Sequence, residues 1–308
     1  MSEKFKKQHI VPQSYLKRFA LFKRDETYVM GTRLCSPKMK TPKFFKSSTA
    51  DVAYRNNYYD TCAQRDKKFW EHYMDDNFDT LCGKPLGSII SSLRLSMPEK
   101  KVLNDAQKDI LARIIVSQSI RVPTFFEKQV ARSEQLLCKY KADILSQISD
   151  QYTDKIELIE KIEFSTDDRK NIVFEAMFDK RRFEKFCTLL REKIWIVYYN
   201  GIRDTLPFVT SDNPVVFAEI GAQNQELTKI GLMNDRLVIL YPIAPDLLIG
   251  IYSPNLFFGK SDFYDSVLKV VKEEKFITRC NTKVIKQSYV HSFLPDPIYS
   301  LLEPSKEN

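Results

Sequence analysis

Glycine is scarce in this sequence, with 8 residues in 308. Neither Gly-x-Gly-x-x-Gly nor a complete Gly-x-x-x-x-Gly-Lys-Ser/Thr motif occurs, which excludes the glycine-rich phosphate loops of Rossmann and P-loop proteins. A Gly-x-Ser-x-Gly elbow is missing as well, and Ser211 next to Asp212 does not make a catalytic triad. The chain therefore lacks the motifs of three large enzyme classes.

Histidine is rarer still, with three residues, and the six cysteines form no Cys-x-x-Cys pair. This spacing predicts neither a zinc knuckle nor a redox motif. The spacing of His9, His72 and His291 does not favour a three-histidine metal centre either. We expect reduced thiols at the widely separated cysteines Cys35, Cys62, Cys82, Cys138, Cys187 and Cys280.

Long apolar runs are also absent. The N-terminal stretch MSEKFKKQHIVPQ lacks the apolar core of a secretory signal. No window approaches the roughly 18 uninterrupted apolar residues that a membrane-spanning helix needs. We therefore expect a cytoplasmic protein without a membrane partner.

The sequence does contain enough apolar residues for a large core, together with an excess of positive charge. Hydrophobic residues make up 43% of the chain, and 48 Lys and Arg against 40 Asp and Glu give a net charge of +8. Such a charge attracts anions, so it favours a nucleic acid or nucleotide partner without identifying one. We interpret the basic residues as spread out rather than gathered in a tail. The oligomeric state is not predicted.

The first part of the chain is predicted to be mostly irregular or helical. Residues 1–60 contain one expected strand at 26–34 and a proline-punctuated basic loop at 36–46. Helical periodicity dominates residues 61–192. Asn104 with Gln107 three residues later predicts a capped helix that ends near Val122, because Pro123 disfavours helix in the residue before it. Further helices are expected at about 66–82, 124–150 and 167–192.

The pattern then changes to period two and to short apolar runs. Five strands rich in Val, Ile and Tyr are expected at 193–200, 206–210, 214–220, 236–243 and 246–253, followed by a helical region at about 261–291. This order predicts an α+β fold, in which a helical middle region packs on a C-terminal, mostly antiparallel β-sheet with a closing helix. No linker separates the β-rich region 193–308 from the helices, so we expect a single domain over 1–308.

Four polar constellations are candidates for chemistry, and each also has a purely structural interpretation. An unperturbed His9 has the pKa of a general base or metal ligand, yet a lone histidine beside apolar residues is commonly a packing residue. Asp212 follows an expected strand, where metal-binding or histidine-orienting acids occur, but the turn also explains it. Arg121 either clamps a phosphate or complements a helix dipole. The constellations are Gln8-His9, Trp70-Glu71-His72, Gln118 with Arg121-Val122-Pro123, and Thr210-Ser211-Asp212-Asn213-Pro214.

Several of these motifs together resemble a known family. HIVPQSYLKRF at 9–19, RVP at 121–123, FVTSDNPVV at 208–216 after Trp195, and YPIAP at 241–245 are similar, in order and spacing, to the prokaryotic domain of unknown function 4238. The resemblance runs from about residue 8 to 293, including Asn281 and Ser288. It implies that the positions defining the family are His9, Pro12, Tyr15, Arg121, Ser211, Asp212, Asn213 and Pro214.

The family's opening motif often carries two consecutive histidines, and Gln8 stands where the first would be. This departure weakens any metal site that needs a histidine pair. The segment HIVP also resembles the start of histidine-based nuclease motifs, although the later Asn and His of a ββα-metal finger are missing.

Our leading hypothesis is a nuclease or other phosphate-directed hydrolase, of the kind found in prokaryotic defence loci. His9 would be the base, and Asp212 would orient it or bind a divalent metal. The substrate-binding residues would be Gln8, Arg121, Ser211 and Asn213. One alternative is a non-catalytic nucleic-acid or protein binding module, in which Tyr15, Leu16 and Phe19 anchor the N-terminal segment and His9 bonds to Asp212. Another alternative is a sensor of small nucleotides. An open cleft that joins His9, Arg121 and Asp212 would favour chemistry.

Overall fold

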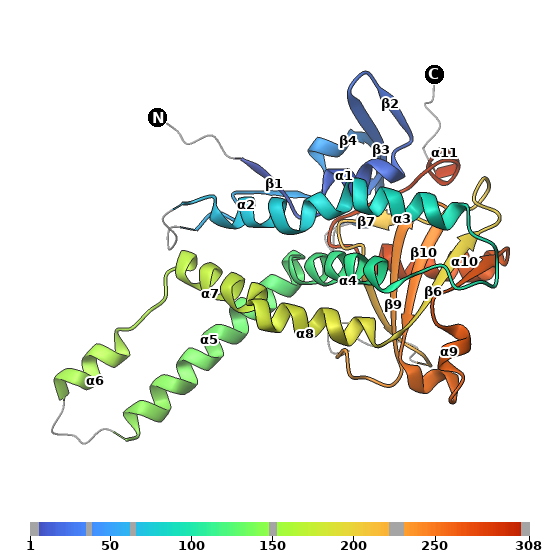
Figure 1. Ribbon diagram of the computed structural model, residues 1–308. Helices are drawn as coiled ribbons and strands as arrows, with labels where there is room; N and C mark the ends of the chain where they lie inside the picture. Colours follow the sequence, from blue (N-terminus) through green and yellow to red (C-terminus); the bar gives the residue numbers. More distant parts are fainter. Residues whose placement is uncertain (1–5, 35–38, 62–65, 148–152, 222–230, 303–308) are drawn as a thin grey trace.

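The computed structural model describes residues 6–34, 39–61, 66–147, 153–221 and 231–302 and has an α+β fold (Figure 1). Its central sheet has the strand order β11-β6-β10-β9-β8. All neighbours pair antiparallel except β11 and β6, which run parallel. The strands are β6 (Ile194–Asn200), β8 (Val216–Glu219), β9 (Leu237–Ala244), β10 (Leu247–Tyr252) and β11 (Val267–Val271).

Both faces of the central sheet are buried, which explains why its strands appear as continuous apolar runs in the sequence. In β6, Trp195 and Val197 point into one hydrophobic core, whereas Ile194 and Ile196 point into a second core on the other face. The same alternation holds along β9 as far as Ile243 and along β10. The period-two prediction for these three strands is therefore confirmed.

Helices cover one face of the central sheet. Leu86, Leu111, Cys187 and Trp195 belong to the same core, so helices from the middle of the chain pack on β6 and its neighbours. The segments are α2 (Phe69–Met74), the π-helical turn η3 (Asp75–Asp79), the 3₁₀ turn η4 (Thr80–Cys82), α3 (Lys84–Arg94), α4 (Asp105–Ile120) and α8 (Lys180–Arg191). This arrangement agrees with a helical middle region placed against the sheet.

The capped helix is confirmed as α4. The Asn104 side chain accepts a hydrogen bond from the Gln107 backbone amide, and the Gln107 side chain accepts one from the Asn104 amide. The helical stretch predicted at 167–192 is divided at Asp179 into α7 (Thr166–Phe178) and α8, because the Asp179 side chain caps α8 by accepting from the Arg182 amide.

The helix predicted at 124–150 is α5 (Pro123–Leu145), and with α6 (Thr153–Glu160) it extends away from the sheet (Figure 1). Residues 148–150 of that prediction lie outside the described chain. Within the described residues, no helix is long and apolar enough to cross a membrane. Cys82, Cys138, Cys187 and Cys280 are free thiols, whereas Cys35 and Cys62 are not among the described residues.

The opposite face of the central sheet is covered by α10 (Glu274–Gln287), whose Ile277, Cys280 and Val284 join the second core. The prediction of a helical region over 261–291 is only partly right. It contains α9 (Ser261–Tyr264), the strand β11 and α10. The five residues VLKVV of β11 pair with β6, and this long-range pairing cannot be recognised from local helical spacing.

A second sheet has the order β2-β3-β12-β7, with β4 also paired to β3. Its strands are β2 (Phe22–Arg24), β3 (Thr27–Leu34), β4 (Lys43–Ser48), β7 (Thr210–Ser211) and β12 (His291–Phe293), and α11 (Ile298–Leu302) packs beside it. The strand expected at 26–34 is thus confirmed. It brings the N-terminal segment together with the turn at 210–214 and the end of the chain.

The prediction that residues 1–60 are mostly irregular is wrong in its described part. Besides β2, β3 and β4, β1 (Lys7–His9) pairs with β5 (Tyr54–Asn56). Strands of three residues are too short to show an alternating pattern, so sequence periodicity misses them. The remaining short elements are α1 (Gln13–Leu16), η1 (Lys17–Phe19), η2 (Thr49–Asp51) and η7 (Pro254–Phe257).

Gly31 in β3 has no room for a side chain. An added Cβ would lie against the Tyr299 ring and 2.6 Å from the Leu294 carbonyl oxygen. We expect Gly31→Ala to lower the free energy of unfolding by about 1–3 kcal/mol, because the neighbours must shift to accommodate the methyl group. Urea denaturation measures this loss. Gly231→Ala is the control, since nothing lies within 4 Å of its Cβ position. Equal effects of the two substitutions would contradict the packing argument.

Candidate functional site

Arg121 follows the last residue of α4 and is the largest charged side chain in the core, with none of its surface exposed. Its Nε donates a hydrogen bond to the Ile10 carbonyl at 2.6 Å, and its Nη1 donates to Asp79 Oδ1, also at 2.6 Å. Burial acts to lower the pKa of Arg121, but the Asp79 carboxylate outweighs it and the pKa lies above its ordinary value. Arg121 therefore stays charged while it joins three segments of the chain.

Gln8, in β1, has its side chain buried and bonded at both ends. Its Nε2 donates to Asp60 Oδ1 at 2.6 Å and to Glu71 Oε2 at 3.2 Å. Its Oε1 accepts from the Tyr59 backbone amide at 2.7 Å. These contacts fix β1 against the segment that leads into α2. The buried and bonded side chain of Gln8 is therefore poorly accessible to a substrate.

His9 is half-buried, and its Nε2 lies 3.3 Å from the Thr49 carbonyl oxygen. Burial lowers the pKa of His9, although the hydrogen bond to Thr49 acts in the opposite direction. Arg121 contributes to lowering this pKa and Asp79 to raising it, so both groups lie within electrostatic range of the ring. A neutral imidazole that donates to a backbone carbonyl is the state most consistent with these contacts.

Asp212 is buried in the turn after β7. Its Oδ1 accepts from the Tyr289 amide at 2.7 Å, and its Oδ2 accepts from the amides of Val290 and His291 at 2.8 Å. Burial raises the pKa of Asp212 to about 6, against the opposing effect of these backbone hydrogen bonds. The ring of His291 is also close, with its Nδ1 3.9 Å from Oδ2, and burial lowers the pKa of this histidine. The carboxylate thus holds the turn to the strand β12.

The residues next to Asp212 also form hydrogen bonds within the chain. The Ser211 hydroxyl accepts from the Asn213 amide at 3.1 Å, and Asn213 Nδ2 donates to the Gln287 carbonyl at 3.0 Å. Thr210 connects this turn to the N-terminal segment, because the Tyr15 hydroxyl lies 2.7 Å from Thr210 Oγ1 and donates to the Pro242 carbonyl at 2.6 Å. Tyr15, Leu16 and Phe19 are fully buried and anchor that segment.

The predicted site residues therefore lie at two buried junctions. Gln8, His9 and Arg121 are near one another, and Ser211, Asp212 and Asn213 form the second group. Over the described ranges, no hydrogen bond or ion pair joins His9 or Arg121 to Asp212. The hydrogen bond expected between His9 and Asp212 is not formed.

No group of three or more His, Cys, Asp or Glu side chains that could hold a metal ion is found in the part of the chain that the structure describes. Gly259-Lys260-Ser261 matches the end of a P-loop motif, but Pro254 stands where its first glycine would be. The helix that follows, α9, has four residues, and Gly259 and Lys260 line a shallow surface depression with Phe263. It does not form a phosphate-binding loop.

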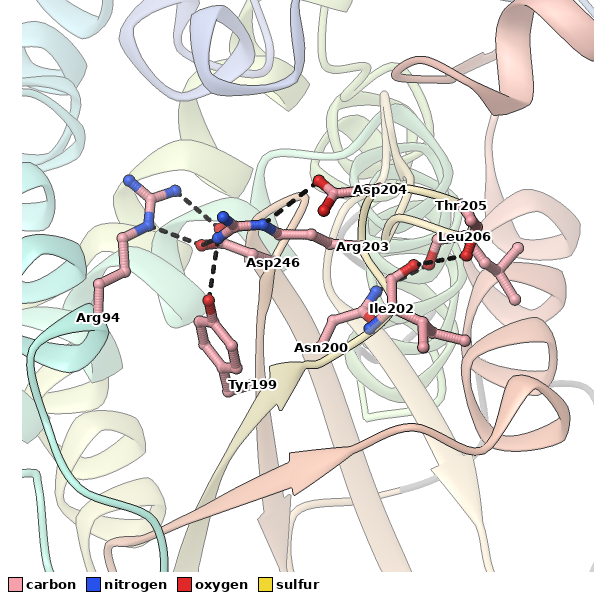
Figure 2. Close-up of polar contacts among 9 residues, drawn as sticks. All are labelled: Arg94, Tyr199, Asn200, Ile202, Arg203, Asp204, Thr205, Leu206 and Asp246. Atoms are coloured by element: carbon pink, nitrogen blue, oxygen red, sulfur yellow. Dashed lines mark hydrogen bonds and ion pairs between the residues drawn. The ribbon is translucent and has the colours of Figure 1, made fainter.

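Sequence reasoning missed a polar cluster around Asp246, in the turn between β9 and β10 (Figure 2). The Asp246 side chain is 3% exposed and accepts two hydrogen bonds of 2.7 Å from Arg94, at the end of α3. Arg203 Nη1 lies 3.2 Å from the same carboxylate and donates to the Tyr199 hydroxyl at 3.0 Å. The participants are far apart in sequence and form no motif, so only the fold reveals the cluster.

The distribution of charge was also misjudged. Residues 1–60 contain 13 Lys and Arg against 5 Asp and Glu, an excess of eight that equals the net charge of the whole chain. The remaining 248 residues are balanced. Counting by segment, rather than over the whole sequence, would have revealed this asymmetry.

The raised pKa of Asp212 predicts a pH dependence of stability. Between about pH 4 and pH 6 the folded chain keeps a proton on Asp212 that the unfolded chain, with its ordinary pKa of 3.8, has released. The contribution of Asp212 to the free energy of unfolding therefore falls by about 2–3 kcal/mol as pH rises through this window. Above the window this contribution is constant. We expect Asp212→Asn to remove this pH-dependent part.

Urea denaturation from pH 4 to pH 8 measures the effect as the difference between variant and wild type. Asp143→Asn is the control, because Asp143 is exposed on α5. A difference between Asp212→Asn and wild type that does not change with pH would contradict a raised pKa at this position.

The chain was compared with protein families and with known proteins. A family model described as a protein of unknown function (DUF4238) matches residues 7–294. Searches of curated proteins and of solved structures found no match. The matched range includes both buried junctions and nearly all of the described fold. The chain therefore belongs to the DUF4238 family.

Proposed function

We propose that this protein binds nucleic acid through its N-terminal segment without cleaving it, and that the family-defining polar residues hold this segment in place. The observation that carries the proposal is the burial of those residues. Gln8, Arg121, Ser211 and Asp212 are each at most 2% exposed, and each forms hydrogen bonds within the chain, although Arg121 Nη2 has no partner among the described residues. Groups that act on a phosphodiester must reach it, so these contacts favour a structural role.

The surface that we assign to nucleic acid is the basic hairpin, defined as β2, β3 and β4 with the described residues that join them. Arg24, Arg33, Lys40 and Lys43 belong to it and form no ion pair in the described structure. Other N-terminal cations are partly neutralised, as Lys6 is by Glu71 at 2.7 Å. Unpaired cations at the surface can contact phosphates and release counterions, which is the main source of non-specific affinity.

Two exposed aromatic rings accompany these charges. Phe22 in β2 is 47% exposed and Phe45 in β4 is 38% exposed. Phe22 pairs with Val29 and Phe45 with Thr32, so the two rings emerge from opposite faces of the strands. Exposed rings among cations provide stacking positions for unpaired bases. We therefore infer that single-stranded nucleic acid binds at least as well as duplex.

The nuclease hypothesis remains the second proposal. It requires His9 to act as a base and Asp212 to orient it or to bind a divalent metal, and these two residues belong to separate buried junctions. The half-buried ring of His9 is the one observation that favours it, because this residue alone of the predicted catalytic pair retains partial access to solvent. A nucleotide sensor would need a pocket at the same junctions.

We expect neutralisation of the basic hairpin to weaken binding of nucleic acid. The triple variant Arg24→Gln, Lys40→Gln, Lys43→Gln should bind single-stranded RNA, single-stranded DNA and duplex DNA about tenfold or more weakly, irrespective of sequence. For duplex DNA, the slope of log affinity against log salt concentration should decrease by about 0.9 for each lost phosphate contact. Fluorescence anisotropy over a series of salt concentrations measures both quantities.

The matched control changes the net charge equally at another place. Lys180→Gln, Arg181→Gln, Lys185→Gln neutralises three exposed cations of α8 and should leave affinity nearly unchanged. Equal losses of affinity in the two triple variants would show that binding depends on the net charge of the protein and not on the basic hairpin. Absence of binding by the wild type would refute the proposal. Cleavage with Mg²⁺ or Mn²⁺ that His9→Ala and Asp212→Ala both remove would establish the nuclease instead.

A further inference from the structure

The cluster around Asp246 places two arginines on one carboxylate. Arg94, from the end of α3, and Arg203, from the loop after β6, enter the cluster from different sides (Figure 2). Asp246 is buried beneath them, whereas the arginine side chains are 46% and 44% exposed. The hydrogen bond to Asp246 is the main cause that raises the pKa of Arg94, so this guanidinium is held in its charged form.

The two guanidinium groups keep donors that the chain does not use. Arg94 bonds to Asp246 through Nε and Nη2, and Arg203 does so through Nη1. Among the residues that the structure describes, none accepts a hydrogen bond from Arg94 Nη1 or Arg203 Nη2. One buried carboxylate neutralises only one of the two cations, and planar guanidinium groups suit the oxygens of phosphate and carboxylate groups.

A second cluster in the same chain has equal numbers of positively and negatively charged groups. Asp109 accepts from Arg113 at 2.8 Å and from Arg191 at 2.6 Å, much as Asp246 accepts from its two arginines. Here a second acid completes the neutralisation, because Glu184 lies 2.8 Å from Arg113. The Asp109 cluster thus has two cations and two closely bonded anions, and we expect no ligand there.

The Asp246 cluster also has a second acid, Asp204, but this acid forms no hydrogen bond with either arginine. Asp204 is 94% exposed, and its Oδ1 lies 3.7 Å from Arg203 Nε, beyond hydrogen-bond distance. An ion pair with so much exposure is screened by water and contributes little. Asp204 shows that a carboxylate can approach the outer side of Arg203, and an incoming anion would displace it.

We propose that Arg94 and Arg203 form a binding site for an oxyanion, a phosphate or carboxylate group of a small ligand, with Asp246 as the buried anchor that orients both guanidinium groups. The Tyr199 hydroxyl, which accepts from Arg203, fixes the direction of that side chain. The site lies outside the basic hairpin, so it goes beyond the nucleic-acid binding proposed above and does not depend on it.

Isothermal titration of the full chain with inorganic phosphate tests the site, and adenosine monophosphate and acetate are titrated separately to distinguish a free ion, a phosphomonoester and a carboxylate. Arg203→Ala should weaken binding about tenfold or more, since hydrogen bonds between charged groups are the strong ones. The fold should persist, because Arg94 still pairs with Asp246 through two hydrogen bonds. Asp204→Asn should strengthen binding several-fold by removing the competing carboxylate.

Arg191→Ala is the matched control, because it removes a similarly exposed arginine from the balanced Asp109 cluster. It should leave phosphate affinity unchanged. The proposal is overturned if the wild type binds none of the three anions. It is also overturned if Arg203→Ala and Arg191→Ala weaken binding equally, or if Asp204→Asn weakens it. Thermal melting of each variant identifies any that does not fold, and Arg203→Gln then replaces Arg203→Ala.

Discussion

The fold depends on one buried charge. Arg121 has no exposed surface, and a guanidinium in such a place is costly unless an opposite charge pairs with it. Among the described residues, its Nη2 has no hydrogen-bond partner, so the pairing rests on Nε and Nη1. Asp79 supplies the opposite charge and the Ile10 carbonyl supplies an acceptor. The π-helical turn η3 carries Asp79 and β1 leads into Ile10, so the end of α4 holds two other segments in register. A shift of any one segment would leave a buried charge unpaired.

The second junction extends this constraint to the C-terminal half. Asp212 accepts three backbone amides of residues 289–291, and Tyr15 reaches from the N-terminal segment to Thr210 and Pro242. The residues of the two junctions are therefore connected through the interior rather than through an open cleft. Function is then expected on the surfaces that these junctions position, which include the basic hairpin and the arginine pair at Asp246.

Local signals in the sequence predicted the parts of the fold that depend on local interactions. The capping box at Asn104 and the alternating residues of β6 were read correctly, because a cap and a two-sided strand each leave a pattern within a few residues. The strand β11 was missed since its partner β6 is distant in sequence. The strands β1 and β5 were missed because three residues cannot display a period.

The candidate site was harder to predict than the fold. The motifs identified candidate residues, but a residue type does not reveal whether a side chain faces solvent or the core. Arg121 is informative here, because its partner Asp79 lies 42 positions away and nothing in the sequence relates the two. The same holds for Arg94, Arg203 and Asp246, which meet only after the β9–β10 turn and the end of α3 are folded together.

The most direct measurement is the free energy of unfolding of Arg121→Met, Asp79→Leu and the double variant, by urea denaturation. An ion pair between the fully buried Arg121 and the 22% exposed Asp79 that organises the fold predicts a loss of about 3 kcal/mol or more for Arg121→Met. It also predicts partial recovery in the double variant, because the second change removes the unpaired carboxylate. A loss below about 0.5 kcal/mol for Arg121→Met, the level of an ordinary surface substitution, would contradict the account. Arg121 would then again be a candidate for binding a substrate.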